Sequence, residues 1–93
     1  MITCTVEMWG LPRELSGVPQ VELKVKDDAG LRDIIAALKK TVPVLEGAVI
    51  SSGGDCLEDT CAFAIGGQFY VEGEDVKLKN GDRLRLLTLA TGG

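Results

Sequence analysis

Polar and apolar residues alternate strictly over residues 2–9, which is the period of a strand with one buried face. The apolar positions are Ile2, Cys4, Val6 and Met8. The same alternation returns over residues 21–26, where every second residue is Val or Leu and the others are Glu or Lys. Glycines and prolines punctuate residues 10–19, so we expect a connection there. The pattern predicts two N-terminal strands joined by a loop.

A helical period replaces the alternation over residues 31–41. The apolar positions have the i, i+3, i+4, i+7, i+11 spacing of one helical stripe: Leu31, Ile34, Ile35, Leu38 and Val42. Aspartates precede and open this segment, two lysines lie in its last turn, and Pro43 prevents its continuation. We therefore expect one main helix that buries this stripe.

The C-terminal half predicts three further strands, after a weakly patterned stretch at residues 44–60 that favours a short irregular helix and a loop. Residues 61–65 and 68–72 flank a Gly66-Gly67 turn, and residues 83–89 follow a turn at residues 78–82. The order of elements predicts an α+β roll in which a mixed five-stranded sheet packs on one main helix. With its 93 residues, the chain is expected to form one domain, 1–93, with a flexible tail at 90–93.

Composition excludes several classes of function. Acidic residues outnumber basic ones by 14 to 10, and the net charge of −4 argues against the phosphate backbone of nucleic acids as a ligand. The chain has no histidine, which removes Ser-His and Cys-His catalysis and every His-ligated metal site. We therefore expect neither an enzyme nor a nucleic-acid-binding protein.

Three cysteines, an odd number, are typical of reduced thiols in the cytoplasm. The chain has no export signal and no apolar run near the roughly 18 residues of a spanning helix, so we expect no membrane association. Cys56 and Cys61 could form a redox pair or, with Cys4, a three-thiolate metal site. Their spacing is not Cys-x-x-Cys and no fourth ligand is evident, so we predict no metal site.

Two other features are interpreted structurally. Trp9 and Phe69 are expected to be packing residues. The acidic run Glu72, Glu74, Asp75 is expected to form a solvated turn, which could also meet a basic partner surface.

The tail, residues 90–93, belongs to none of the predicted helices and strands, and it ends on Gly92-Gly93. A terminal α-carboxylate is ionised at neutral pH and can act as a nucleophile towards phosphorus. Attack on the α-phosphate of ATP, on a partner enzyme, would give an acyl-adenylate whose carbonyl could pass to sulfur or to an amine. Glycine suits a narrow cleft because it has no Cβ. Gly93 is therefore the candidate reacting residue, with Gly92 beside it.

The strand before the tail predicts a partner-binding surface. If Leu84 and Leu86 point into the core, alternation places Leu87 on the opposite, solvent-facing side together with Leu89. Exposed leucines beside a functional tail would form an apolar patch of the kind that marks interfaces. The candidate partner-binding residues are Leu87, Leu89, Ala90 and Thr91.

Several motifs, in this order and ending on Gly92-Gly93, resemble those of the ubiquitin-like β-grasp sulfur carriers, the family that includes the molybdopterin synthase small subunit and the thiamin-biosynthesis sulfur carrier. The similar segments are residues 13–17, the helix at 31–38, the turn at 65–67 and the Leu-x-x-Gly-Asp turn at 78–82. The sequence departs from the family pattern in having Gly66 for the turn asparagine and Leu89-Ala90-Thr91 where Pro-Pro is common.

This resemblance implies a β-grasp fold and a carrier that is not itself an enzyme. It also implies two partners: an adenylating enzyme that uses ATP, and a sulfur-accepting biosynthetic enzyme that receives sulfur from a thiocarboxylate on Gly93. No cofactor would be bound stably. Molybdopterin synthesis is the foremost pathway, with tungsten-type pterins, thiamin, a sulfur-containing amino acid and tRNA thiolation as the others. The alternatives are a ubiquitin-like modifier conjugated to lysines through Gly93 and a non-catalytic β-grasp interaction module.

Overall fold

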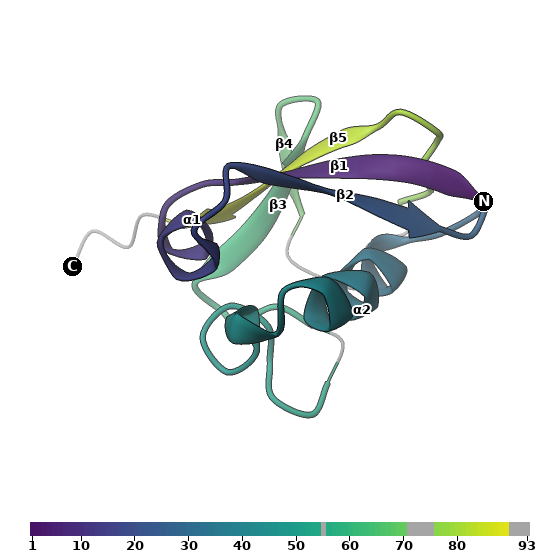
Figure 1. Ribbon diagram of the computed structural model, residues 1–93. Helices are drawn as coiled ribbons and strands as arrows, with labels where there is room; N and C mark the ends of the chain where they lie inside the picture. The colour runs from purple at the N-terminus through teal and green to yellow at the C-terminus, as the bar shows by residue number, and fades with distance from the viewer. Residues whose placement is uncertain (55, 71–75, 90–93) are drawn as a thin grey trace.

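The computed structural model describes residues 1–54, 56–70 and 76–89. Five strands form one sheet: β1 (Ile2–Met8), β2 (Gln20–Val25), β3 (Cys61–Ile65), β4 (Gln68–Tyr70) and β5 (Arg83–Thr88). Their order across the sheet is β2-β1-β5-β3-β4, with β1 and β5 parallel and the other neighbours antiparallel. Helix α2 (Leu31–Thr41) covers one face of this sheet (Figure 1). The mixed sheet on one main helix confirms the predicted α+β roll.

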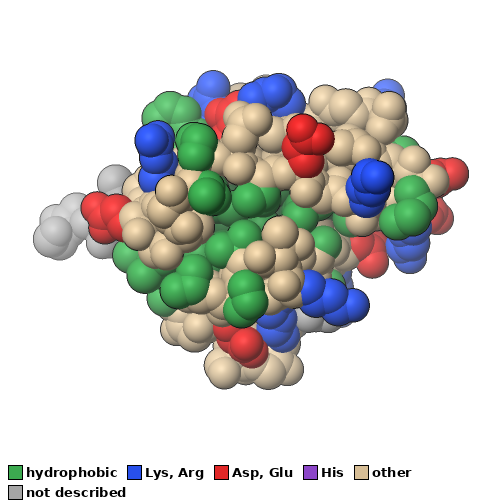
Figure 2. All heavy atoms as spheres, viewed as in Figure 1, with side chains coloured by type: hydrophobic (Ala, Val, Ile, Leu, Met, Phe, Trp, Pro, Cys, Tyr) green, Lys and Arg blue, Asp and Glu red, His purple; other side chains and the backbone are tan. Residues whose placement is uncertain are grey.

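The core lies between this inner face of the sheet and α2. The apolar residues of β1 are buried, and so are four residues of the predicted helical stripe: Leu31, Ile34, Ile35 and Leu38. Phe63 of β3 is fully buried among them. Figure 2 shows hydrophobic side chains in the middle of this view, between the sheet and the helices, with charged side chains around the margin. The alternating strand pattern and the helical stripe in the sequence thus form the two layers of the core, the sheet and α2.

The expected connection at residues 10–19 contains a helix that the sequence analysis missed, α1 (Leu11–Ser16). Pro12 lies in its first turn, and the N–H of Gly17 closes it by donating to the carbonyl of Arg13 at 2.9 Å. Leu11 and Leu15 pack against the core. A helix of six residues is too short to show a helical period, and Gly10 and Gly17, which suggested a loop, are its caps.

The weakly patterned stretch holds a 3₁₀ helix, η1 (Pro43–Leu45), followed by a loop tied to the core by Leu45, Val49 and Ile50. This agrees with the short irregular helix that was predicted. Strand β4 ends at Tyr70, and the rest of the predicted strand, residues 71–72, lies outside the described residues, as does the acidic run Glu72, Glu74, Asp75. No helix within the described ranges is long and apolar enough to cross a membrane.

Both predicted turns are confirmed. Gly66 and Gly67 have φ of 56° and 87°, the positive values that a two-residue hairpin turn requires at both positions. In the turn before β5, Asn80 Oδ1 accepts the N–H of Thr3 at 2.8 Å and the N–H of Gly81 donates to the carbonyl of Thr3 at 2.8 Å. These bonds join the start of β5 to β1 and so fix which β5 residues face away from α2.

Candidate functional site

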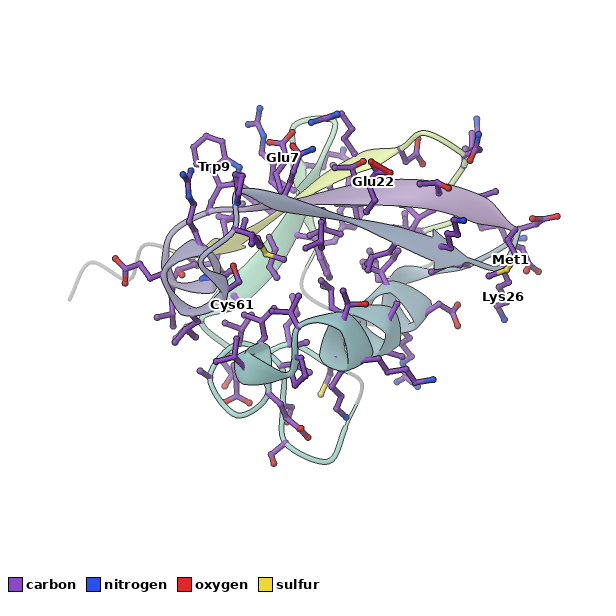
Figure 3. The ribbon with its side chains drawn as sticks, viewed as in Figure 1. Met1, Glu7, Trp9, Glu22, Lys26 and Cys61 are labelled. Carbon is purple, nitrogen blue, oxygen red and sulfur yellow. The ribbon has the colours of Figure 1, made fainter. Side chains whose placement is uncertain are left out.

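The outer face of the sheet, opposite α2, carries a charged cluster that spans β1 and β5. Parallel pairing sets Glu7 beside Arg85 and Thr5 beside Arg83. Glu7 and Trp9 point away from α2 (Figure 3). Arg83 and Arg85 are exposed, whereas the alternate residues Leu84 and Leu86 are buried. Side chains separated by more than 70 positions in the sequence therefore meet on this face.

Glu7 is the centre of this cluster. Its Oε2 lies 3.0 Å from Nη2 of Arg83 and accepts from Nε of the same residue at 3.1 Å. Its Oε1 accepts from Nε1 of Trp9 at 3.3 Å and lies 3.6 Å from Nε of Arg85. The hydrogen bond from Arg83, then that from Trp9, lowers the pKa of Glu7. Glu7 is thus held as a carboxylate that orients two guanidinium groups.

A hollow of about 540 Å³ opens next to the cluster. Its apolar lining comes from Trp9, Phe69, Leu87 and Ala64, and Gly66 and Gly67 also line it. Trp9 is 51% exposed and Phe69 64% exposed, so the prediction that they are packing residues was wrong. The reason is that both lie on the sheet face opposite α2, which none of the described helices covers. Phe69 pairs with Ala64, out of phase with the buried Phe63.

Five residues of this face were not predicted as candidate site residues: Glu7, Trp9, Phe69, Arg83 and Arg85. A signal for Trp9 was present, since it is out of phase with the buried Met8. The rest depends on strand register, which joins residues 7, 64, 69 and 85 across four strands.

One of the predicted partner-binding residues, Leu87 of β5, lines this hollow. Leu87 is half-buried, and Leu89, just past the strand, is also half-buried. The predicted outward orientation of Leu87 is confirmed, but neither leucine is fully exposed. Their contact with a partner stays a prediction, and Ala90, Thr91, Gly92 and Gly93 lie outside the described residues.

The chain is held from two sides just before the tail. On one side, the N–H of Leu11 donates to Oγ1 of Thr88 at 3.2 Å. On the other, the N–H of Leu89 donates to the carbonyl of Thr60 at 2.6 Å. Gly10 permits the first contact because its φ is +64° and because a Cβ there would lie 3.2 Å from Oγ1 of Thr88. We call Gly10, Leu11, Thr60, Thr88 and Leu89 the tail anchor.

We expect Gly10→Ala to loosen the tail anchor and to lower the free energy of unfolding by about 1–3 kcal/mol, because alanine is strained at a positive φ of this kind. Gly54→Ala is the matched control, since Gly54 has no positive φ and its added methyl would meet only Sγ of Cys56, at an ordinary 3.7 Å. Urea unfolding measures both. If Gly10→Ala and the unchanged chain had equal free energies of unfolding, alanine at position 10 would cause no strain beside Thr88, contrary to this prediction.

The three cysteines are not joined in a disulfide, and two of them are buried. The buried ones are Cys4 and Cys61, and burial raises the pKa of both of these thiols. Over residues 1–54, 56–70 and 76–89, no three His, Cys, Asp or Glu side chains gather in a way that could hold a metal ion.

Known proteins match the chain over nearly its whole length. A family model described as the ThiS family matches residues 6–93. The crystal structure of SAMP1 from Haloferax volcanii is 27% identical and has a TM-score of 0.81, with 98% of this chain and 99% of that chain covered. A Pyrococcus furiosus protein designated molybdopterin converting factor, subunit 1, is 23% identical, with a TM-score of 0.75 and 97% and 100% covered. No curated protein sequence matches the chain.

The small archaeal modifier protein 1 from Methanosarcina acetivorans is also similar in structure, with a TM-score of 0.77 at 23% identity over 100% of this chain and 98% of its own. The fold is therefore the ubiquitin-like β-grasp, and the family model extends from within β1 to the end of the sequence. The chain belongs to the ThiS family of ubiquitin-like β-grasp sulfur carriers.

Proposed function

We propose that this protein carries sulfur as a thiocarboxylate on Gly93. The observation that carries the proposal is the ThiS-family match, which extends through Gly92-Gly93. The tail anchor supports it, because it fixes the chain at Leu89, immediately before the proposed reacting segment. Four residues beyond Leu89 can span at most about 13–14 Å when extended, a reach suited to a cleft on a partner enzyme.

The proposed reaction takes place on that partner and begins with ATP. A carboxylate oxygen of Gly93 attacks the α-phosphorus, a P–O bond forms, and pyrophosphate leaves. Hydrosulfide then attacks the carbonyl carbon of the acyl-adenylate, a C–S bond forms, and AMP leaves. The chain supplies the carboxylate and needs no catalytic side chain of its own, so it acts as a co-substrate and holds no stable cofactor.

Molybdopterin synthesis is the proposed destination of the sulfur. The similarity to the Pyrococcus furiosus molybdopterin converting factor subunit supports this assignment over the other pathways. The enzyme that accepts the sulfur is then the second partner, after the adenylating enzyme. We place this chemistry in the cytoplasm, where three free cysteines stay reduced.

The second candidate function is conjugation to proteins. It is favoured by the similarity to SAMP1 of Haloferax volcanii and to the small archaeal modifier protein 1 of Methanosarcina acetivorans. In this case the adenylated Gly93 would pass to a lysine amine, which forms an amide bond and releases AMP.

A reconstituted reaction separates the two candidates. The protein is incubated with its activating enzyme and ATP, and either sulfide or a lysine-containing acceptor protein is added. The sulfur-carrier proposal predicts a free thiocarboxylate with sulfide and no isopeptide product. An isopeptide product at the expense of the thiocarboxylate would favour the modifier, and neither product would favour the interaction module.

We expect the double variant Cys56→Ser, Cys61→Ser to keep its rate of thiocarboxylate formation within about twofold of the unchanged chain, because sulfur is accepted by the terminal carbonyl and not by a thiol. Mass measurement of the loaded protein checks this, with circular dichroism to show that the variant folds. Since Cys61 is buried, Cys56→Ser alone is the milder test. Loss of loading in a folded variant would instead assign the transfer to a cysteine.

A further inference from the structure

Arg85 is the residue of the outer face that is placed to bind something outside the chain. Its guanidinium lies over the Trp9 ring, 5.4 Å from the ring centroid, and its Nε is 3.6 Å from Oε1 of Glu7. Its side chain is 62% exposed, and its guanidinium donates no hydrogen bond to any residue in the described part of the chain. Stacking and the ion pair therefore orient a guanidinium that has no hydrogen-bond acceptor among the described residues.

Arg83 differs from Arg85 in this respect. Its Nε donates to Glu7 and its Nη2 donates to Oε1 of Gln20 at 3.2 Å, so neighbours already use much of its donor capacity. The hollow thus contains two guanidinium groups and one carboxylate, and the positive charge left over lies on Arg85, in a chain whose net charge is −4. A carboxylate matches this excess, and the planar fork of arginine binds a carboxylate through two parallel hydrogen bonds.

The apolar part of the hollow has room for a large side chain. Trp9, Phe69 and Leu87 line it, and Gly66 and Gly67, which also line the hollow, have no side chains that would fill it. Exposed aromatic residues and arginine next to a hollow are the composition of the energetically important centre of protein interfaces. A carboxylate-binding group and an apolar surface thus lie side by side in one hollow, which a single short segment can occupy.

We propose that the hollow between Trp9, Phe69 and Arg85 docks a segment of a partner protein in which an Asp or Glu lies next to a large apolar residue. The carboxylate binds the guanidinium of Arg85, and the apolar side chain lies against Trp9, Phe69 and Leu87. The inference deepens the proposed function, since Leu87 joins the hollow to the tail and the same partner can engage both. It rests on that function only for the identity of the partner.

The test uses peptide selection on the full chain without ATP or any activating enzyme, so that tail chemistry plays no part. A random-peptide phage library is selected against the protein, and an enriched peptide is then titrated while fluorescence is recorded. Trp9 is the sole tryptophan, and it lies in the hollow, so its emission reports occupancy directly. We expect the enriched sequences to share an acidic residue beside a large apolar one, and their binding to shift Trp9 emission to shorter wavelength.

Arg85→Glu should raise the dissociation constant of the enriched peptide by about tenfold to a hundredfold, which is the effect of losing a hydrogen-bonded charge pair. Arg32→Glu is the matched control, with the same change of charge at an exposed position of α2, on the other side of the sheet. It should bind as the unchanged chain does. Phe69→Ala, which changes a 64% exposed side chain, should also weaken binding and serves if Arg85→Glu fails to fold.

Several outcomes overturn the proposal. These are failure to enrich any acidic–apolar sequence, equal binding by the unchanged chain and Arg85→Glu, and binding of an oligothymidylate in preference to the peptide. A shift of Trp9 emission with protein concentration alone would show that a second copy of the chain fills the hollow. A protein that binds the peptide but is never sulfurated would contradict the proposed function and leave this inference standing.

Discussion

Deleting Gly93 is expected to abolish activation while the fold keeps its stability. The deletion withdraws the terminal carboxylate by one residue, about 3.3–3.6 Å, and a misplacement of even about 1 Å can cost a hundredfold in rate when reacting atoms must approach to about 3 Å. ATP–pyrophosphate exchange with the activating enzyme should therefore fall by at least about a hundredfold. The free energy of unfolding, measured with urea, should change by no more than about 0.5 kcal/mol, which is the usual range for changes at exposed positions.

The variant Gly92→Val tests whether activation depends on the conformational freedom of the tail as well as on its length. It leaves the carboxylate at the same number of residues from Leu89, but its β-branched side chain adds bulk and restricts the backbone in a narrow cleft. We expect exchange to fall here as well. Exchange at the unchanged rate by the chain without Gly93 would contradict the carrier mechanism and favour an interaction module with an incidental tail.

The double variant Leu87→Asp, Leu89→Asp is expected to raise the KM of the activating enzyme for the carrier by about thirtyfold or more. Each leucine, if central to the interface, contributes at least about 1 kcal/mol, and a charge in its place adds the cost of desolvation. The rate at saturating carrier should change less, because the reacting atoms at Gly93 are untouched. Steady-state exchange kinetics measure both quantities.

Val44→Asp is the control for this variant, since Val44 is 51% exposed and lies on η1, on the helix side of the sheet. It should activate normally. Because Leu87 and Leu89 are half-buried, unfolding of the double variant is measured first, and Leu87→Ala replaces it if the fold is lost. A folded double variant with an unchanged KM would remove these leucines from the partner surface.

The β-grasp architecture could be predicted because its main elements are periodic. The stripe from Leu31 to Leu38 marks one continuous buried surface, and the helix begins and ends where the sequence predicts, at Leu31–Thr41. Helix α1 could not be found in this way, since six residues make fewer than two turns and its signal is carried by caps alone. Local pattern is therefore informative only where an element is long enough to repeat it.

The outer face could be predicted only in part. Alternation along β5 correctly separates Leu87 from the buried Leu86, because that is a property of one strand. The meeting of Glu7 with Arg83 and Arg85 needs the parallel pairing of β1 with β5, which the turn at residues 78–82 sets through its bonds to Thr3. Trp9 and Phe69 were assigned to packing because large apolar residues usually pack, but the uncovered side of the sheet leaves them exposed.

The central claim is that Gly93 carries sulfur, and intact-mass analysis of the protein purified from its native cells tests it most directly. We expect a fraction of free protein whose mass is raised by the replacement of one oxygen with sulfur. Fragmentation should place this change at the last residue, and hydrolysis should reverse it. Protein found only with an unmodified carboxylate, or only as conjugates to lysines of other proteins, would contradict it.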